Sequence, residues 1–180
     1  MNYSISFEKA FAETMENEGF YANNPNDRGG ETYRGISRRF HPEWEGWATV
    51  DACENKKSLR AATLLEDSVK VFYHKNFWQP NRFEQIVNGR LGRKLFDIAV
   101  NAGSSTAGLL FQKALNFLGA ELKTDGKIGP RTIRAYDNLT PRNDERCLKV
   151  VCGLQIAYFV AITEKRPDQK VWARGWLERV

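Results

Sequence analysis

The stretch ENEGFYANNPNDRGGETYRGI, residues 16–36, decides the fold because it separates a helical N-terminus from everything that follows. Its four Gly, four Asn and one Pro are residues that favour turns. Gly29 and Gly30 precede the short run Glu31-Thr32-Tyr33, a pattern typical of a β-hairpin. We therefore expect a small β-lobe directly after the first helix.

Residues 4–18, which lead into this stretch, have the periodicity of an amphipathic helix. One face carries, at three- and four-residue steps, Phe7, Ala10, Phe11, Thr14, Met15 and Glu18. Ser4 or Ser6 is expected to cap the start of this helix, and Gly19 to end it in a left-handed conformation. The apolar face runs directly into Glu18, whose carboxyl is therefore expected to point inward.

Helical periodicity returns after the turn-rich stretch and continues towards the C-terminus. We expect helices over residues 57–79, 91–102, 105–118, 130–139 and 142–165. Pro80 is expected to end the first of these, Gly103 to separate the second from the third, and Pro130 to start the fourth. The predicted fold class is mainly α with a small β-hairpin lobe.

The composition fits one domain, or two small lobes that share a core, with an anionic partner. The chain has 180 residues, 42% of them hydrophobic, and a net charge of +5. Nucleic acid, membrane and cell-wall polymer are all compatible with that charge. Three cysteines and two histidines match no zinc spacing or redox pair, so no metal or cofactor is expected.

The N-terminal sequence MNYSISFEKAFAETMENE lacks the basic and apolar regions of a secretory signal. Synthesis in the cytoplasm without a signal peptide is therefore expected. No run approaches the about 18 apolar residues of a membrane span, so no membrane insertion is expected.

Glu18 is the first candidate catalytic residue. Burial, the negative end of the helix macrodipole and the nearby Glu16 would each favour the protonated form of a carboxyl. A carboxyl that stays protonated near neutral pH is what a general acid needs. The alternative is that Glu18 frays into solvent with the helix end.

Asp27 and Thr32 complete the candidate catalytic set. A helix end followed by a hairpin that folds back would hold Glu18 and Asp27 across a cleft. Glu18 would then protonate a glycosidic oxygen, while an ionised Asp27 would orient water or stabilise positive charge on the sugar. Thr32 would position that water with its hydroxyl. The alternative for Asp27 is an Asx-turn residue that only shapes the loop.

These residues carry a family resemblance. They form the run Glu18-Gly19-Phe20-Tyr21, Pro25, Asp27, Gly29-Gly30, Thr32 and Gly35-Ile36. This run resembles the E-G-G-Y…P-x-D-x-G-G-x-T-x-x-G-I signature of the glycoside hydrolase 108 N-acetylmuramidases, lysozyme-like proteins of phages and Gram-negative bacteria that include endolysins and proteins named secretion activators. The resemblance implies a lysozyme-like α+β fold with Glu18 as the catalytic acid, and roles for Asp27 and Thr32. Phe20 departs from the signature because it replaces the second Gly.

The second half of the chain carries another resemblance. Its motifs are Leu95 to Gly103, Phe111 to Asn116 and Asp125 to Thr132. They are similar to the predicted peptidoglycan domain that usually follows this catalytic region. We therefore predict a catalytic region over residues 1–90 and a helical peptidoglycan-binding region over residues 91–180, packed into one compact unit. The implied partner is a peptidoglycan glycan strand, with no nucleic acid.

Four residues are assigned to substrate binding. Tyr21 and Tyr33 lie near the carboxyls in sequence, and rings in a cleft stack on sugar faces, although most such rings are core residues. Asp97 and Asn101 are four residues apart on an otherwise apolar helix, so they either join the lobes or face the cleft.

The predicted function is hydrolysis of the β-1,4 bond between N-acetylmuramic acid and N-acetylglucosamine. The protein would reach the wall with a holin-type partner, by lysis or by another export path. Two alternatives stay open. One is a peptidoglycan-binding protein without catalysis, and the other is a helix-turn-helix DNA-binding protein, suggested by basic residues at 90–94 and a turn then a helix at 126–136. The candidate recognition helix PRTIRAYDNL carries only two basic residues, which weighs against DNA binding.

Overall fold

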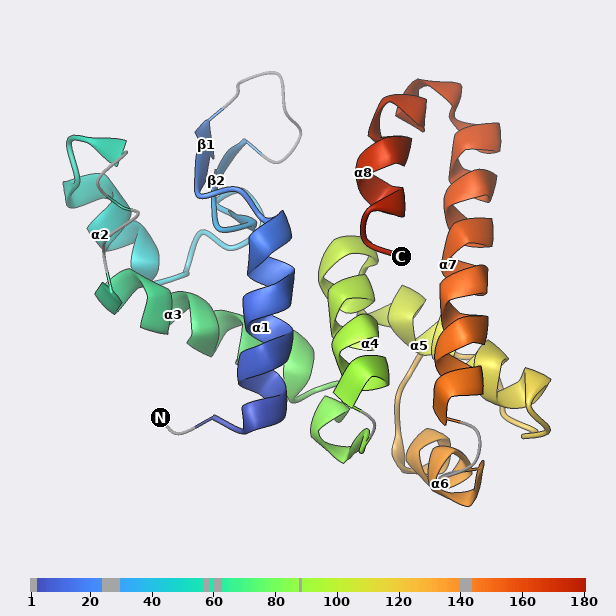
Figure 1. The fold of residues 1–180 in the computed structure, drawn as a ribbon. Helices are drawn as coiled ribbons and strands as arrows, with labels where there is room; N and C mark the ends of the chain where they lie inside the picture. The colour runs from blue at the N-terminus through green and yellow to red at the C-terminus, as the bar shows by residue number, and fades with distance from the viewer. Residues whose placement is uncertain (1–2, 24–29, 57–58, 60–62, 88, 140–143) are drawn as a thin grey trace. The chain divides into compact units, whose positions relative to one another are not determined.

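The computed structural model describes residues 3–23, 30–56, 59, 63–87, 89–139 and 144–180. Over these residues the chain is mainly α-helical with a small antiparallel sheet (Figure 1), as the sequence predicts. The chain divides into two compact units, Met1–Pro80 and Asn81–Val180. The predicted boundary at residue 90, and the predicted packing of the two regions into one compact unit, stay predictions.

The first helix, α1 (Ile5–Asn17), forms where the periodicity predicts it. Ser4 caps it, because its hydroxyl accepts a hydrogen bond from the backbone N–H of Phe7 at 3.2 Å. The predicted apolar face is buried, with exposed fractions between 0% and 6% for Phe7, Ala10, Phe11, Thr14 and Met15. Burial of this face fixes the rotation of α1 and hence the direction in which its last residues point.

The end of α1 differs from the prediction at Gly19. Glu18 already has extended backbone angles, with φ −92° and ψ 132°, and Gly19 is not among the glycines with positive φ. The predicted left-handed conformation of Gly19 is therefore wrong. The reason is that the chain passes directly into β1 (Tyr21–Asn23), which requires an extended backbone and not a reversal.

The predicted β-lobe is confirmed as an antiparallel sheet in the order β1-β2-β3. β2 (Glu31–Tyr33) pairs with β1 so that Tyr21 lies opposite Tyr33, and with β3 (Ile36–Ser37) so that Tyr33 lies opposite Ile36. Two residues connect β2 to β3, Arg34 with φ 48° and Gly35 with φ 76°. Positive φ at both central residues is the type I′ pattern of tight hairpins.

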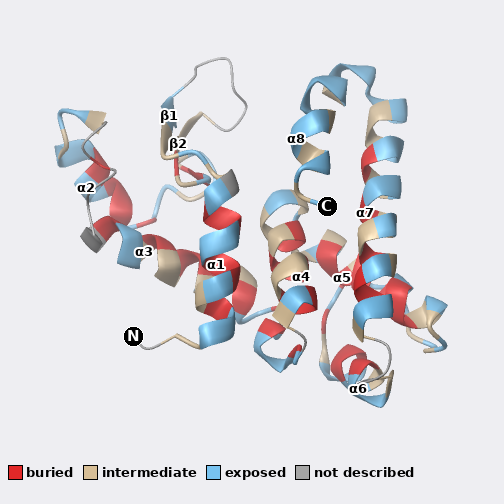
Figure 2. Ribbon diagram, in the orientation of Figure 1, coloured by how far each residue is buried: buried red, intermediate tan, exposed pale blue. Residues whose placement is uncertain are grey.

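The first unit is completed by α2 (Gly46–Ala52), α3 (Thr63–Tyr73) and a π-helical turn, η2 (His74–Trp78). Its core is aromatic, with ring centroids 5.4 Å apart for Phe7 and Trp78 and 6.0 Å apart for Phe11 and Tyr73. Buried residues accordingly lie on the facing sides of α1 and α3 (Figure 2). The sequence predicts that Pro80 ends the helix expected over residues 57–79 by moving the residue before it out of helical backbone, but Gln79 keeps helical angles of φ −65° and ψ −46°, so that reason is wrong.

Arg38 fixes the β-lobe to α2. Its guanidinium contacts Glu31 of β2 at 2.8 Å and Asp51 of α2 at 2.6 Å. It also lies 4.4 Å above the centroid of the Trp47 ring. The sheet is therefore held by charged and aromatic contacts as well as by its own short ladders.

Among the described residues, the regular elements of the second unit are all helices. Its elements are η3 (Phe83–Gln85), α4 (Gly89–Ala102), α5 (Ser104–Phe117), α6 (Pro130–Leu139), α7 (Asp144–Lys165), η4 (Pro167–Trp172) and α8 (Ala173–Leu177). Gly103, with φ 91°, separates α4 from α5, and Pro130 starts α6, both as predicted. α5 packs against α4 and α7, and its buried face forms the core of this unit.

The turn before α6 is anchored on α5 by Gln112. The side-chain amide of Gln112 donates to Asp125 Oδ1 at 2.9 Å and accepts from the backbone N–H of Gly126 at 2.9 Å. A Cβ on Gly108 would lie only 2.1 Å from the carbonyl oxygen of Gly126. The motif from Asp125 to Thr132 thus forms a tight turn that lies directly on α5.

Among the described helices, α7 is long and apolar enough to cross a membrane by length and composition alone. Core helices of proteins that stay in water pass the same test, so the indication is weak. The expectation of no membrane insertion stays a prediction.

Candidate functional site

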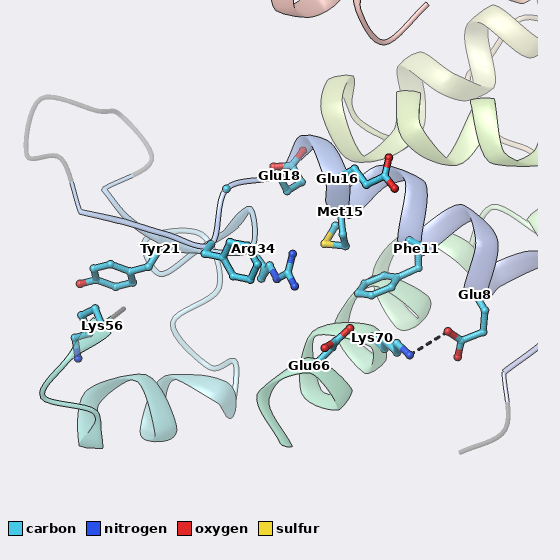
Figure 3. Close-up of a pocket in the computed structure, with 13 residues that line it drawn as sticks. Glu8, Phe11, Met15, Glu16, Glu18, Tyr21, Arg34, Lys56, Glu66 and Lys70 are labelled. Carbon is cyan, nitrogen blue, oxygen red and sulfur yellow. Dashed lines mark ion pairs between the residues drawn. The ribbon is translucent and has the colours of Figure 1, made fainter. Parts of the chain in front are cut away.

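Glu18 lies at the C-terminal end of α1 and lines a pocket of about 930 Å³. The pocket lies within the first unit, and Figure 3 shows the side chains around it. α1 contributes an apolar wall that includes Phe11 and Met15, while Arg34 and Tyr21 come from the β-lobe. The volume is in the range of small-molecule sites. Glu18 is half-buried and its carboxyl lies against Gly35, so the alternative in which it frays into solvent does not describe this structure.

The Glu18 carboxyl lies directly over Gly35. A Cβ built on Gly35 would lie 2.7 Å from Glu18 Oε2 and 3.2 Å from Glu18 Cδ. It would also lie 2.7 Å from the hydroxyl of Tyr73, which donates a hydrogen bond to the carbonyl oxygen of Arg34 at 2.7 Å. Because Gly35 has no side chain, the Glu18 carboxyl and the Tyr73 hydroxyl can both lie against the β2–β3 turn.

Charged side chains surround the rest of the pocket. Lys70 forms an ion pair with Glu8 at 3.0 Å, at the end of the pocket away from the sheet. Lys56 donates to the backbone carbonyls of Val50 and Cys53 at the end of α2. Arg34 lies over the ring of Phe20, with 3.9 Å between the guanidinium carbon and the ring centroid. The pocket thus combines four glutamates, Glu18 among them, with an apolar wall and a cation stacked on an aromatic ring.

The structure describes one of the two other predicted catalytic residues, Thr32. Asp27 lies outside the described residues. Thr32 is on β2, half-buried, opposite Ala22 of β1 and Ser37 of β3. It belongs to the same small sheet as the turn that contacts Glu18, but it is not among the residues that line the pocket. The catalytic roles of Asp27 and Thr32 stay predictions.

The two predicted sugar-binding tyrosines have different surroundings. Tyr21 lines the pocket, and its hydroxyl donates to Glu31 Oε1 at 2.9 Å. Burial, together with this bond to Glu31, raises the pKa of Tyr21 above its usual value. Tyr33 is 2% exposed, stacks on Trp44 and donates to the carbonyl oxygen of Leu59 at 3.1 Å. Tyr33 is therefore a core residue of the lobe, and a part in substrate binding stays a prediction.

Asp97 and Asn101 lie on α4, in the second unit. Asp97 forms an ion pair with Arg179 at 3.1 Å, and both side chains are largely buried, with 13% and 11% exposed. It therefore ties α4 to the C-terminal residues. Asn101 is exposed on the same helix. Their predicted role in substrate binding stays a prediction.

Sequence reasoning missed Arg34 and Tyr73 as residues of this site. An Arg-Gly dipeptide between two short strands was a signal for a tight turn, because Gly at the second position permits positive φ. No sequence signal connects Tyr73 with Glu18, since α3 brings them together from distant parts of the chain. Among the described residues, no cluster of three or more His, Cys, Asp or Glu side chains is arranged to hold a metal ion.

A half-buried glutamate at the end of the first helix, beside a small antiparallel sheet and a pocket, is compatible with the predicted lysozyme-like fold. Comparison with known families agrees. Residues 11–103, more than half of the chain, match the family described as Glycosyl hydrolase 108, and the chain belongs to this family. Residues 106–180 match the domain described as Predicted Peptidoglycan domain. The predicted family and the domain that follows it are therefore confirmed, and the protein is a lysozyme-like protein that acts on peptidoglycan.

A solved structure agrees with this fold. The chain is similar to Brucella abortus SagA, with a TM-score of 0.65 and 21% sequence identity over 97% of this chain and 88% of that one. At this level of identity the likeness shows the fold alone. No curated protein matches the chain.

Proposed function

We propose that the protein is an N-acetylmuramidase that hydrolyses the β-1,4 bond between N-acetylmuramic acid and N-acetylglucosamine in peptidoglycan. The observation that supports this most is the position of the Glu18 carboxyl, which lines the pocket and is held over Gly35 at the end of α1. A general acid needs a fixed carboxyl with access to the leaving-group oxygen. In this proposal Glu18 gives its proton to the glycosidic oxygen, and the departing sugar leaves as a free hydroxyl.

The second half of the reaction is assigned to the β-lobe. Glycoside hydrolases generally use a second carboxylate, which activates water or stabilises the oxocarbenium-like transition state. We assign this role to Asp27 because of its place in the family signature, and we assign the positioning of water to Thr32. Both assignments rest on the sequence.

The biological setting is proposed as endolysis or remodelling of the cell wall. The family membership and the peptidoglycan domain support action on the wall. The protein would be made in the cytoplasm and reach the wall with a holin-type partner or by another export path. The net charge of +5 is compatible with glycan strands that carry peptide carboxylates.

The test compares release of reducing ends from purified peptidoglycan by the wild type and by Glu18→Gln. Loss of a general acid costs about 10²–10⁴-fold in rate, while Gln keeps the shape of the side chain. Glu13→Gln is the matched control, because Glu13 is exposed on the same helix and does not line the pocket. Activity that survives in Glu18→Gln would overturn the assignment of the acid.

Binding of each variant to insoluble peptidoglycan is measured in parallel. Wild type that binds the wall but releases no reducing ends would be a peptidoglycan-binding protein without catalysis. Wild type that does not bind the wall at all would return the DNA-binding alternative to consideration.

A further inference from the structure

Arg34 occupies a backbone position that does not suit it. It is the first central residue of the β2–β3 turn and has φ 48°. Type I′ turns favour Asn, Asp or Gly at this position, because a positive φ brings the Cβ of other residue types too close to the following carbonyl oxygen. Non-glycine residues with positive φ gather at functional sites. The backbone of this turn does not favour Arg, so the reason for an Arg at position 34 is expected in what its side chain contacts.

That side chain reaches into the pocket that holds Glu18. The guanidinium lies 3.9 Å from the centroid of the Phe20 ring, and Figure 3 shows Arg34 pointing towards the apolar wall formed by Phe11 and Met15. Stacking on an aromatic ring fixes the plane of a guanidinium and leaves the N–H groups at its edge for hydrogen bonds. Tyr33 takes one such bond from Arg34, and the other N–H groups are left for a ligand. Phe20 is also the residue at which this chain departs from the signature that it resembles.

Of the three cations that line the pocket, Arg34 is the one that neither a carboxylate nor a backbone carbonyl engages among the described residues. Lys70 is paired with Glu8, and Lys56 is engaged by two backbone carbonyls. Glu66 also lines the pocket, but no ion pair joins it to Arg34. A ligand carboxylate that enters the pocket would therefore find its charge complement at Arg34.

We propose that Arg34, stacked on Phe20, binds a carboxylate carried by the muramic acid unit of the substrate. This proposal rests on the proposed function and deepens it by naming a subsite and the substrate group it recognises. The planar guanidinium matches a carboxylate with two parallel hydrogen bonds. Gly35, the next residue, lies under the Glu18 carboxyl. Binding at Arg34 therefore places the muramic acid unit next to the acid.

Two carboxylate sources share this chemistry. In glycan with stem peptides the lactyl carboxyl of muramic acid is an amide, so the charged groups belong to the peptide. In glycan without peptides the lactyl carboxylate is free. Three soluble disaccharides separate these cases: one with a stem peptide, the same compound with its carboxylates converted to primary amides, and one without a peptide.

The experiment measures binding of the three disaccharides by titration calorimetry to Glu18→Gln protein, in which cleavage is suppressed. It is repeated in a Glu18→Gln background that also carries Arg34→Asn, because Asn is favoured in this turn, so the substitution removes the cation and its stacking on Phe20 without adding backbone strain. Lys75→Gln, an exposed cation outside the pocket, is the control for net charge. Hydrogen bonds to charged groups predict that amidation weakens binding about 10- to 100-fold when Arg34 is present. The ratio is expected to fall to near 1 in Arg34→Asn and to be unchanged in Lys75→Gln.

The third disaccharide identifies the source. Binding as tight as that of the peptide compound would show that the lactyl carboxylate suffices, and weak binding would assign the site to peptide carboxylates. Equal affinity for the charged and amidated compounds, an equal loss of both in Arg34→Asn, or no binding would overturn the proposal. Reducing-end release by the wild type tests the proposed function separately, since the charge contrast in binding does not require cleavage.

Discussion

Replacing Gly35 with Ala tests how the β2–β3 turn positions the candidate acid. The new Cβ would lie 2.7 Å from both Glu18 Oε2 and the Tyr73 hydroxyl. This separation is shorter than a non-bonded contact between carbon and oxygen, so the carboxyl or the hydroxyl would have to move. The residue would also have to keep a φ of 76°. The substitution therefore strains the backbone and displaces the carboxyl at the same time.

The two effects have different sizes. The left-handed conformation costs a non-glycine residue about 1–2 kcal/mol, and loss of the bond from Tyr73 to the Arg34 carbonyl costs about 1 kcal/mol more. For a chain of this length, each kcal/mol lowers Tm by about 2–4 °C, so a decrease of about 5–10 °C is expected. Displacement of a catalytic group by about 1 Å costs on the order of 10²-fold in rate, and we expect a loss of that size in kcat/KM.

The assay is reducing-end release from peptidoglycan at a temperature at which both variants are folded, with thermal unfolding measured alongside. Gly119→Ala is the matched control: Gly119 has φ 107°, but a Cβ there has nothing within 4 Å. It should lose stability and keep its activity. If Gly35→Ala kept wild-type activity, or if both variants lost activity equally, the contact between Gly35 and Glu18 would not be what positions the acid.

Three further predictions concern stability and titration. Ser4→Ala removes the cap of α1 and should cost about 1 kcal/mol, a decrease in Tm of about 2–4 °C, whereas Ser4→Asp should not. Arg179→Met removes the cation that faces Asp97 and should lower the free energy of unfolding by about 2 kcal/mol, less than the ~3–5 kcal/mol of a fully buried pair. An unchanged midpoint of denaturant unfolding would show that this ion pair does not hold the C-terminal residues on α4. The hydrogen bond from Gln112 lowers the pKa of Asp125 below its usual 3.8. The contribution of the ionised Asp125 to stability is therefore present above pH 3.8 and lost as the pH falls through the folded-state pKa of this carboxyl. In Gln112→Met, NMR titration should show the pKa of Asp125 rise towards 3.8.

The sequence predicted best those features that depend on local patterns. The three- and four-residue steps of Phe7 and its neighbours defined α1 because burial of one face imposes that period. Gly103 and Pro130 marked helix boundaries because their backbone preferences act locally. Gly19 misled for the same reason. Local preference allowed a left-handed end to α1, but the pairing of β1 with β2 required an extended exit.

In the candidate site, too, the residues with local signals were predicted and those that depend on tertiary contacts were not. Glu18 was identified from its place at the end of an apolar helix face, which is a local property. Tyr73 and Arg34 were not, because their contacts depend on how α3 and the hairpin pack against α1. Asp97 illustrates the opposite case, since a polar residue on an apolar helix signals a partner but does not say which one. The structure supplies Arg179.

The stability of Arg34→Asn distinguishes a functional residue from a structural one. Asn relieves up to about 1 kcal/mol of strain at a positive φ, while loss of the stacking on Phe20 costs about 0.5–1 kcal/mol. The two nearly cancel, so Tm should stay within about 3 °C of the wild type. A side chain kept for packing would instead show a clear decrease in Tm when removed. Weaker binding of charged disaccharides at unchanged Tm would therefore mean that Arg34 is needed for the ligand and not for the fold, whereas a decrease of 5 °C or more would assign it to the hairpin.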